Sequence, residues 1–249
     1  MPGFGVLLTA WVAIGLVAFI ALQFVDAPYG KMTKQGWGPG IPNRLAWMLM
    51  EVVVLVSFAV AHTLAGGRWG PATTVFAGLF VLHYVNRSLI YPWRTRTRGN
   101  IVPASIFVAS TLFNTVNGAF LGWDFAQHAD RGVAWFTDPR FIVGIVVFGV
   151  GMGVNWASDT ILIRLREPGE TGYRIPHGGG FRWVSSPNLL GEIIEWAGFA
   201  LLTWTPSALA FLVWTCANLV PRARANHRWY RARFPDYPPE RRALVPGLW

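Results

Sequence analysis

Charged residues and cysteines are scarce in this chain of 249 residues. Only 13% of the residues are charged, about half the share of an average soluble domain, while 53% are hydrophobic. This balance argues against a water-soluble globule, a disordered chain and a nucleic-acid-binding protein. The single cysteine, Cys216, cannot form an internal disulfide, which excludes a disulfide-stapled scaffold and a redox-active thiol pair.

Common catalytic and metal-binding motifs are also missing. The five histidines show neither the H-E-x-x-H pattern nor close pairing, and there is no cysteine cluster, so the sequence predicts no metal site. There is no G-x-S-x-G nucleophile motif. Gly149, Gly151 and Gly153 resemble a dinucleotide-binding fingerprint, but no strand precedes them, so we interpret them as small residues that let helices pack closely.

Long apolar runs dominate what is present. A helix needs about 20 apolar residues to cross the hydrocarbon layer, and seven stretches approach this length. They predict an all-α integral membrane protein with seven transmembrane helices in one domain, residues 1–249. No basic residue precedes the first stretch and no cleavage pattern ends it, so we expect a span there rather than a signal peptide. The stretches are Gly5–Val25, Leu45–Leu64, Ala72–Tyr91, Val102–Trp123, Phe141–Ile163, Leu189–Trp204 and Ser207–Leu219.

Basic residues gather in alternate loops and in the C-terminal tail. Lysine and arginine are retained on the cytoplasmic side of a membrane, so this pattern predicts an outside N-terminus and a cytoplasmic C-terminus. A bacterial inner membrane or the endoplasmic reticulum membrane would fit. The net charge of +9 has two interpretations, attraction to anionic lipid or an anionic ligand bound on the cytoplasmic face.

Polar residues interrupt the apolar spans at helical spacing. A polar or ionisable group at membrane depth is costly, so each is a candidate functional residue. The pairs Asn155 with Asp159 and Trp47 with Glu51 are four residues apart and share a helix face, and Arg166 continues the first face. Two further sets follow the same rule: Asn188, Glu192 and Glu195; and Tyr84, Arg87 and Tyr91.

One loop and one pair of groups suggest ligand chemistry. The loop EPGETGYRIPHGGGFRWVSSPN combines glycines, which allow close approach to a ligand, with Tyr173 and Arg174. A solvated cytoplasmic loop is the alternative. A carboxyl group at Glu51 and a phenol at Tyr84 in an apolar cavity could both donate hydrogen bonds, because burial keeps a carboxylic acid neutral.

Several consecutive segments resemble the steroid 5α-reductase family. They are YGKMT, GMGVNWASDTILIRLREPGETGYRIPHGGGF, NLLGEIIEW and NHRWYRARFPDYPPERRALVPGLW, which together extend from about Tyr29 to the C-terminus. The resemblance implies a seven-helix membrane enzyme that uses NADPH to reduce the Δ4 double bond of 3-oxo steroids. It implies a steroid or similar apolar enone and membrane lipid as partners, and no nucleic acid. We expect a monomer.

The resemblance also assigns site residues. It implies that Glu51 polarises the substrate carbonyl with Tyr84 as its partner. The NADPH contacts that it implies are Tyr29, Trp47, Arg87, Tyr91, Arg98, Asn155, Asp159, Arg166, Tyr173, Arg174, Asn188, Glu192 and Tyr230.

This chain departs from the family pattern at two places. Where the family has a run of three histidines, the chain has Ala225, Asn226 and His227, so the histidine contact falls on Asn226, with His227 as the alternative. An arginine of the fourth span is replaced by Ala109.

Other functions remain open on the residues alone. They are reduction of a polyprenol or a long-chain enoyl thioester, a membrane methyltransferase, and a non-catalytic sterol binder or transporter. A transporter of this size often shows internal repeats, and the sequence shows none.

Overall fold

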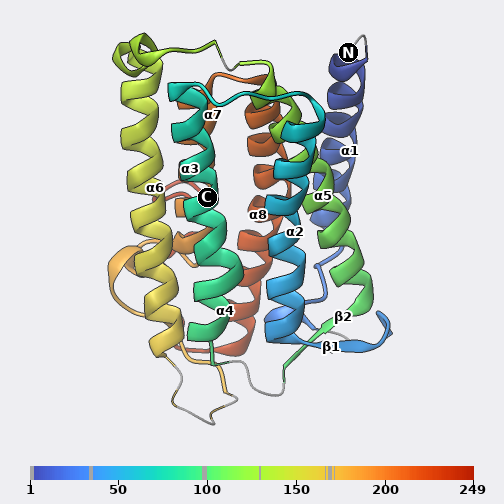
Figure 1. The fold of residues 1–249 in the computed structure, drawn as a ribbon. Helices are drawn as coiled ribbons and strands as arrows, with labels where there is room; N and C mark the ends of the chain where they lie inside the picture. Colours follow the sequence, from blue (N-terminus) through green and yellow to red (C-terminus); the bar gives the residue numbers. More distant parts are fainter. Residues whose placement is uncertain are drawn as a thin grey trace. The chain divides into compact units, whose positions relative to one another are not determined.

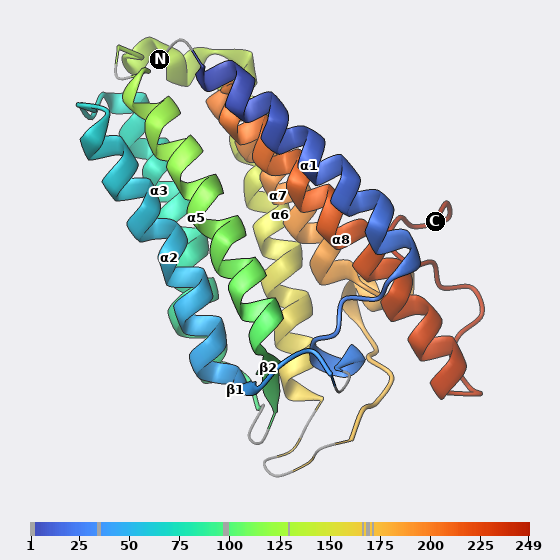
Figure 2. The same ribbon diagram turned by 90° about the vertical axis from the view of Figure 1, so that its right-hand side faces the viewer.

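The computed structural model describes residues 3–33, 36–96, 100–128, 130–165, 167, 170 and 172–249. The chain forms two compact units, each described by itself. Unit 1 comprises Met1–Asp26, Gly144–Phe199 and Ala210–Trp249, and unit 2 comprises Ala27–Val143 and Ala200–Leu209. Figures 1 and 2 show the helices that build them.

Unit 1 is built from long helices. The helix α1 and most of α6, α7 and α8 belong to it, together with the short 3-10 helix η4. Their bounds are α1 (Phe4–Phe24), α6 (Pro139–Arg164), η4 (Gly179–Arg182), α7 (Pro187–Thr203) and α8 (Pro206–Arg233).

Unit 2 combines three long helices with a small antiparallel sheet. The strands β1 and β2 pair residue by residue, with Ile41 opposite Val102 at the centre. The elements are η1 (Gly30–Met32), β1 (Gly40–Pro42), α2 (Asn43–Leu64), α3 (Pro71–Val85), η2 (Asn86–Ile90), α4 (Tyr91–Arg94), β2 (Ile101–Pro103), α5 (Ala104–Ala126) and η3 (Val133–Thr137).

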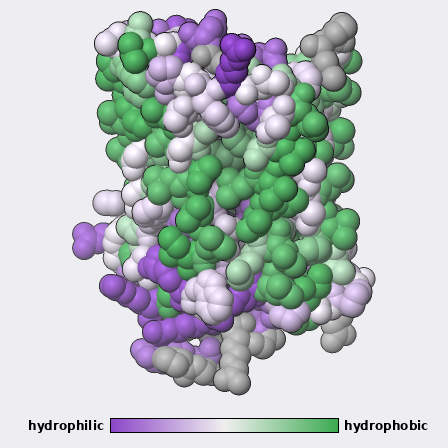
Figure 3. Space-filling view, viewed as in Figure 1, coloured by the Kyte–Doolittle hydropathy of each residue, from purple (hydrophilic) through white to green (hydrophobic). Residues whose placement is uncertain are grey.

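Each of the seven predicted stretches is mostly helical. Among the described residues, four helices, α1, α2, α5 and α6, are long and apolar enough to cross a membrane. Hydrophobic residues cover the middle of the helices in Figure 3, and hydrophilic residues gather near their ends. The chain is therefore mostly helical and fits a multi-pass membrane protein, while a crossing by α3, α7 and α8 stays a prediction.

Two helices differ from the sequence expectation. The third predicted stretch is not one α-helix, because the π-helical turn η2 separates α3 from α4. The helix α8 runs past the end of its apolar stretch at Leu219 to Arg233, with Pro221 inside it. Arginine and alanine favour helix, and Arg231 and Arg233 in the last turn complement the negative end of the helix dipole. Charge therefore ends the apolar run but not the helix.

The helices α2 and α5 are neighbours in both ribbon views and pack together. The buried residues of α2 recur every four positions: Ala46, Met50, Val54, Phe58 and His62. Gly118 and Gly122 of α5 lie against the backbone of α2, where an added Cβ would overlap the carbonyl oxygens of Val54 and Phe58. Glycine therefore sets how closely these two helices approach.

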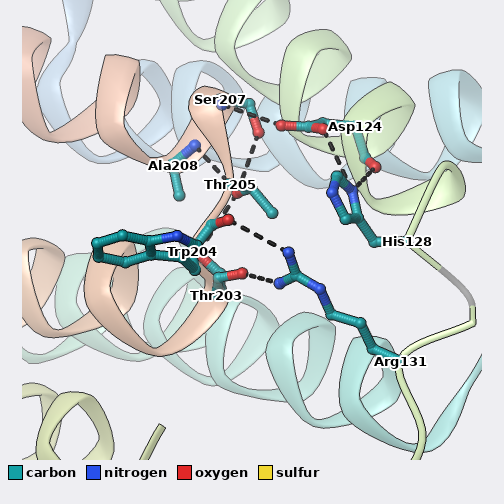
Figure 4. Close-up of polar contacts among 8 residues, drawn as sticks. All are labelled: Asp124, His128, Arg131, Thr203, Trp204, Thr205, Ser207 and Ala208. Atoms are coloured by element: carbon teal, nitrogen blue, oxygen red, sulfur yellow. Dashed lines mark hydrogen bonds and ion pairs between the residues drawn. The ribbon is translucent and has the colours of Figure 1, made fainter. Parts of the chain in front are cut away.

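A polar network holds the turn between α7 and α8, as Figure 4 shows. The Ser207 backbone N–H, at the start of α8, donates to Asp124 Oδ2 at 3.0 Å. The Arg131 guanidinium donates to the carbonyls of Thr203 and Trp204 at the end of α7. Burial lowers the pKa of Arg131, which nevertheless stays a cation at neutral pH. Asp124, next to the start of α8, and Arg131, next to the end of α7, thus bind backbone N–H and carbonyl groups that helix termini leave without a partner in the helix.

Removing the carboxylate of Asp124 should destabilise this turn. We expect Asp124→Ala to lower the free energy of unfolding by about 1–3 kcal/mol, because the buried Ser207 N–H loses its acceptor. Thermal unfolding in detergent, followed by tryptophan fluorescence, measures the effect. Asp130→Ala, at an exposed position of the same connection, is the control and should change stability by less than about 0.5 kcal/mol. Equal effects of the two substitutions would contradict the assignment.

Candidate active site

Three of the predicted residues of unit 2 form an aromatic and cationic cluster. The Arg87 guanidinium lies 5.3 Å from the centre of the Trp47 ring and 5.1 Å from that of Tyr91. The two rings meet edge to face, with centroids 6.5 Å apart. Cation–π attraction of this kind is strongest where water is excluded. The structure therefore brings Trp47, Arg87 and Tyr91 together from α2, η2 and α4.

The π-helical turn places Arg87. Turns of this type are rare and occur often at functional sites. Ser88 Oγ donates to the Tyr84 carbonyl at 2.6 Å, which helps satisfy the backbone where the α-helical pattern ends. Sequence reasoning missed this turn, because residue spacing alone does not distinguish a π-helix from an α-helix.

Glu51 and Tyr84 also belong to unit 2. Glu51 is half-buried on α2 and directly follows the buried Met50. Tyr84, on α3, is only 4% exposed, and its ring packs 4.8 Å from Phe80 and 5.0 Å from His83. An apolar wall of this kind strengthens any hydrogen bond that the phenol makes.

A chain of hydrogen bonds joins three of the predicted residues of unit 1. Asn155 Nδ2 donates to the Asn188 carbonyl at 3.0 Å, and Asn188 Nδ2 donates to Asp159 Oδ1 at 3.0 Å. Asn155 and Asp159 are buried on α6, and Asn188 is the second residue of α7. The prediction that Asn155 and Asp159 share a helix face is confirmed, and Asn188 of α7 forms hydrogen bonds with both.

Glycines make this contact possible. A Cβ at Gly151 would overlap the backbone of Glu195, and a Cβ at Gly191 would lie 2.5 Å from the backbone nitrogen of Asn155. A Cβ at Gly198 would likewise overlap the backbone of Phe148. The helices α6 and α7 therefore touch backbone to backbone, and short amides can bridge them. The interpretation as a helix-packing residue is confirmed for Gly151 but is wrong for Gly149 and Gly153, where an added Cβ would meet nothing within 4 Å.

The loop before α7 lies against the end of α8. The Tyr173 ring contacts the Trp229 ring at 5.0 Å, and Trp229 contacts the Tyr230 ring at 5.3 Å. The Tyr230 ring stacks on Tyr237 with only 8° between their planes. Arg174, which is exposed, pairs with Glu170 at 2.5 Å. Tyr173 and Tyr230, far apart in sequence, therefore belong to one aromatic row.

Two adjacent serines hold the two residues that stand where the resemblance places histidines. Asn226 Nδ2 donates to Ser186 Oγ at 3.1 Å. Ser185 Oγ lies within hydrogen-bonding distance of His227 Nδ1, at 2.6 Å, and of the Tyr237 hydroxyl, at 2.7 Å. Burial lowers the pKa of His227, and the positive charges of nearby Arg231 and Arg242 lower it further. His227 is therefore neutral at pH 7, and both side chains are held in fixed positions.

A tail residue that sequence reasoning missed also fixes the loop. Arg241 is only 4% exposed. Its guanidinium donates to the Pro176 carbonyl at 3.0 Å and lies 3.3 Å from His177 Nδ1. Arg241, Ser185 and Ser186 carry no periodic signal, so only the folded arrangement reveals them.

Residues 100–249 match the family described as 3-oxo-5-alpha-steroid 4-dehydrogenase. The chain belongs to this family. It is similar to 3-oxo-5-alpha-steroid 4-dehydrogenase 2 of Homo sapiens, with 42% identity over 243 residues that cover 95% of the chain and 93% of the relative. It is also 39% identical to a steroid 5-alpha-reductase of Gossypium hirsutum over 98% of the chain and 96% of the relative. The bovine 3-oxo-5-alpha-steroid 4-dehydrogenase 1 is 37% identical over 95% of the chain and 93% of the relative.

The remaining residues assigned from the dehydrogenase family are placed as follows. Tyr29 is half-buried just before η1 in unit 2, and Glu192 is half-buried on α7 in unit 1. Arg98 and Arg166 lie outside the described residues. Within the described ranges, no group of three or more His, Cys, Asp or Glu side chains could hold a metal ion.

The close contact of α6 and α7 yields a prediction with a built-in control. We expect Gly151→Ala to lower the free energy of unfolding by about 1–3 kcal/mol, because the methyl group forces the two backbones apart. A Cβ at Gly153, on the same helix, meets nothing within 4 Å. Gly153→Ala should therefore leave stability unchanged or raise it by up to about 1 kcal/mol. Melting curves of the two variants in detergent decide the point, and equal losses would contradict the packing assignment.

Proposed function

We propose that this chain reduces the Δ4 double bond of 3-oxo-Δ4 steroids and uses NADPH as the reductant. The observation that carries the proposal is the near full-length similarity to relatives named for this dehydrogenase activity. Ionisable side chains on apolar helices, such as Glu51 and Asp159, support it, since such groups are costly at membrane depth and usually mark functional sites.

The residues of unit 1 fit a nicotinamide cofactor. Asn155 Oδ1 is buried and has no hydrogen-bond partner among the described residues. Such an acceptor suits the amide N–H of a carboxamide, since a buried acceptor without a donor is costly. The proposed cofactor residues are Tyr29, Trp47, Arg87, Tyr91, Arg98, Asn155, Asp159, Arg166, Tyr173, Arg174, Asn188, Glu192, Asn226, His227 and Tyr230.

Glu51 and Tyr84 are the proposed catalytic residues. NADPH, when bound, supplies the hydride that adds to C5 of the enone. Glu51, as a neutral acid, and Tyr84 donate hydrogen bonds to the C3 carbonyl oxygen, where negative charge builds. The burial of Tyr84 makes its hydrogen bond stronger than it would be in water. Addition of a proton at C4 then completes the saturated 3-oxo product.

The membrane setting suits the proposed substrate. Unit 1 exposes large apolar side chains on α1, among them Val17 and Phe24, which is 84% exposed. Lipid covers such side chains without cost, and an apolar steroid dissolved in lipid reaches the enzyme without crossing water. We propose seven spans with an outside N-terminus and a cytoplasmic C-terminus, and a monomer as the working form.

A direct assay tests this function. The protein is purified in detergent, mixed with NADPH and a 3-oxo-Δ4 steroid, and followed by loss of nicotinamide absorbance together with formation of the 5α product. We expect both signals in equal amounts. Turnover of a polyprenol or an enoyl thioester without turnover of any steroid would replace the proposed substrate class.

The proposed donors predict distinct rate losses. Tyr84→Phe should lower kcat by about 10²–10³-fold, the usual loss for one preorganised donor. Glu51→Gln should lose less, because an amide N–H still donates, and Glu51→Ala should lose more. Thr215→Val, which also removes a buried hydroxyl, is the control and should change kcat by less than about tenfold. Equal kcat for wild type and Tyr84→Phe would remove Tyr84 from catalysis.

Arginines of the cytoplasmic loops are proposed to bind the cofactor phosphates. A guanidinium offers paired N–H donors that match phosphate oxygens. Replacement of Arg98, Arg166 and Arg174 together by alanine should reduce the preference for NADPH over NADH, measured as the ratio of the two Kd values. Arg228→Ala, which removes the ion pair with Asp26, is the control. An unchanged ratio in the triple variant would contradict the assignment.

A further inference from the structure

Three residues of α5, spaced four positions apart, lie against three backbone carbonyls of α2. Those carbonyls are also spaced four positions apart. Two of the three are the glycines described above, whose missing side chains let the backbones touch. The third is an asparagine, which replaces close packing with a hydrogen bond. The pairs are Asn114 with the Met50 carbonyl, Gly118 with the Val54 carbonyl and Gly122 with the Phe58 carbonyl.

The asparagine is buried and aimed at the backbone of α2. Asn114 is 4% exposed, and its Nδ2 donates to the Met50 carbonyl oxygen at 2.5 Å. In an α-helix this carbonyl already accepts from the N–H four residues on, at Val54. The bond from Asn114 is therefore not needed to satisfy α2. Its effect is to fix α2 against α5, both along the axis and in rotation.

Rotation of α2 matters because Glu51 directly follows Met50. Neighbouring side chains of a helix point about 100° apart, so the rotational setting at Met50 also sets the direction of Glu51. A side-chain end about 5–6 Å from the axis moves about 1 Å when the helix rotates by 10°. A misplacement of 1 Å at a reacting centre can cost about 10²-fold in rate.

We propose that Asn114 is a positioning residue for Glu51. Its amide sets the rotation of α2 at the turn that carries the acid, and so aims the carboxyl group at the substrate carbonyl. This inference rests on the proposed catalytic role of Glu51. It assigns to α5 a part in the reaction that neither the spacing of its residues nor any charge on it indicated.

A double-mutant cycle tests the proposal. Asn114→Leu keeps a similar volume and leaves no buried group unpaired, since the Met50 carbonyl keeps its helical donor. We expect Asn114→Leu to lower kcat about tenfold in the wild-type background and less than twofold in the Glu51→Ala background, because alanine leaves no side chain for the rotation of α2 to aim. Such non-additivity is the signature of residues that act through one another.

Ser57→Ala is the matched control. Ser57 Oγ also donates from one helix of this pair to the other, to the Thr115 carbonyl at 2.5 Å, but about two turns away from Glu51. We expect Ser57→Ala to match Asn114→Leu in melting temperature within about 2 °C, yet to change kcat by less than twofold. Equal kcat losses in the two variants would show a general packing effect and overturn the proposal.

A binding measurement without NADPH supplies a second readout. We expect Asn114→Leu to reduce, by about threefold or more, the ratio of affinities for a 3-oxo-Δ4 steroid and for its 3-deoxy analogue, measured by equilibrium dialysis. An unchanged ratio, or additive kcat losses in the cycle, would overturn the role of Asn114 while Glu51 keeps its own. Normal kcat in Glu51→Ala would instead refute the catalytic role of Glu51, and the positioning role with it.

Discussion

Contact between helix backbones at glycine is the constraint on which the rest of this structure depends. In unit 1, Gly151 and Gly191 bring α6 and α7 so close that Asn155 and Asn188 can bridge them. In unit 2, glycines of α5 do the same against α2. Apolar helices in lipid gain little from hydrophobic association, so close packing and hydrogen bonds must fix their arrangement. The polar groups proposed for chemistry therefore rest on positions that have no side chain at all.

The same constraint explains why so many polar side chains bond to backbone. Asn114, Asn155 and Arg131 each donate to a carbonyl of another helix or its end. A carbonyl is present at every residue, whereas a suitable partner side chain must be encoded separately. Such bonds are nevertheless specific, because only one rotation and one axial setting of two helices bring the donor to its acceptor. They give a bundle of apolar helices a defined geometry.

The sequence predicted the helical stretches and much of the polar set, because apolar length and four-residue spacing are local properties. It placed Asn155 and Asp159 on one face, which the structure confirms. It could not predict the π turn at Arg87 or the bond between Ser185 and His227, which joins segments 42 positions apart. Contacts of that kind arise from tertiary packing and leave no periodic trace. The extension of α8 was missed because hydropathy reports the end of an apolar run and not the end of a helix.

Isotope transfer tests the central claim most directly. The protein is supplied with NADPH that carries deuterium at both C4 positions of the nicotinamide and with an unlabelled 3-oxo-Δ4 steroid, and the product is examined by mass spectrometry and NMR. The account predicts one deuterium, located at C5 of a 5α product. Deuterium at any other carbon, or a reduced product without label, would contradict direct hydride delivery to an enone polarised at its carbonyl oxygen.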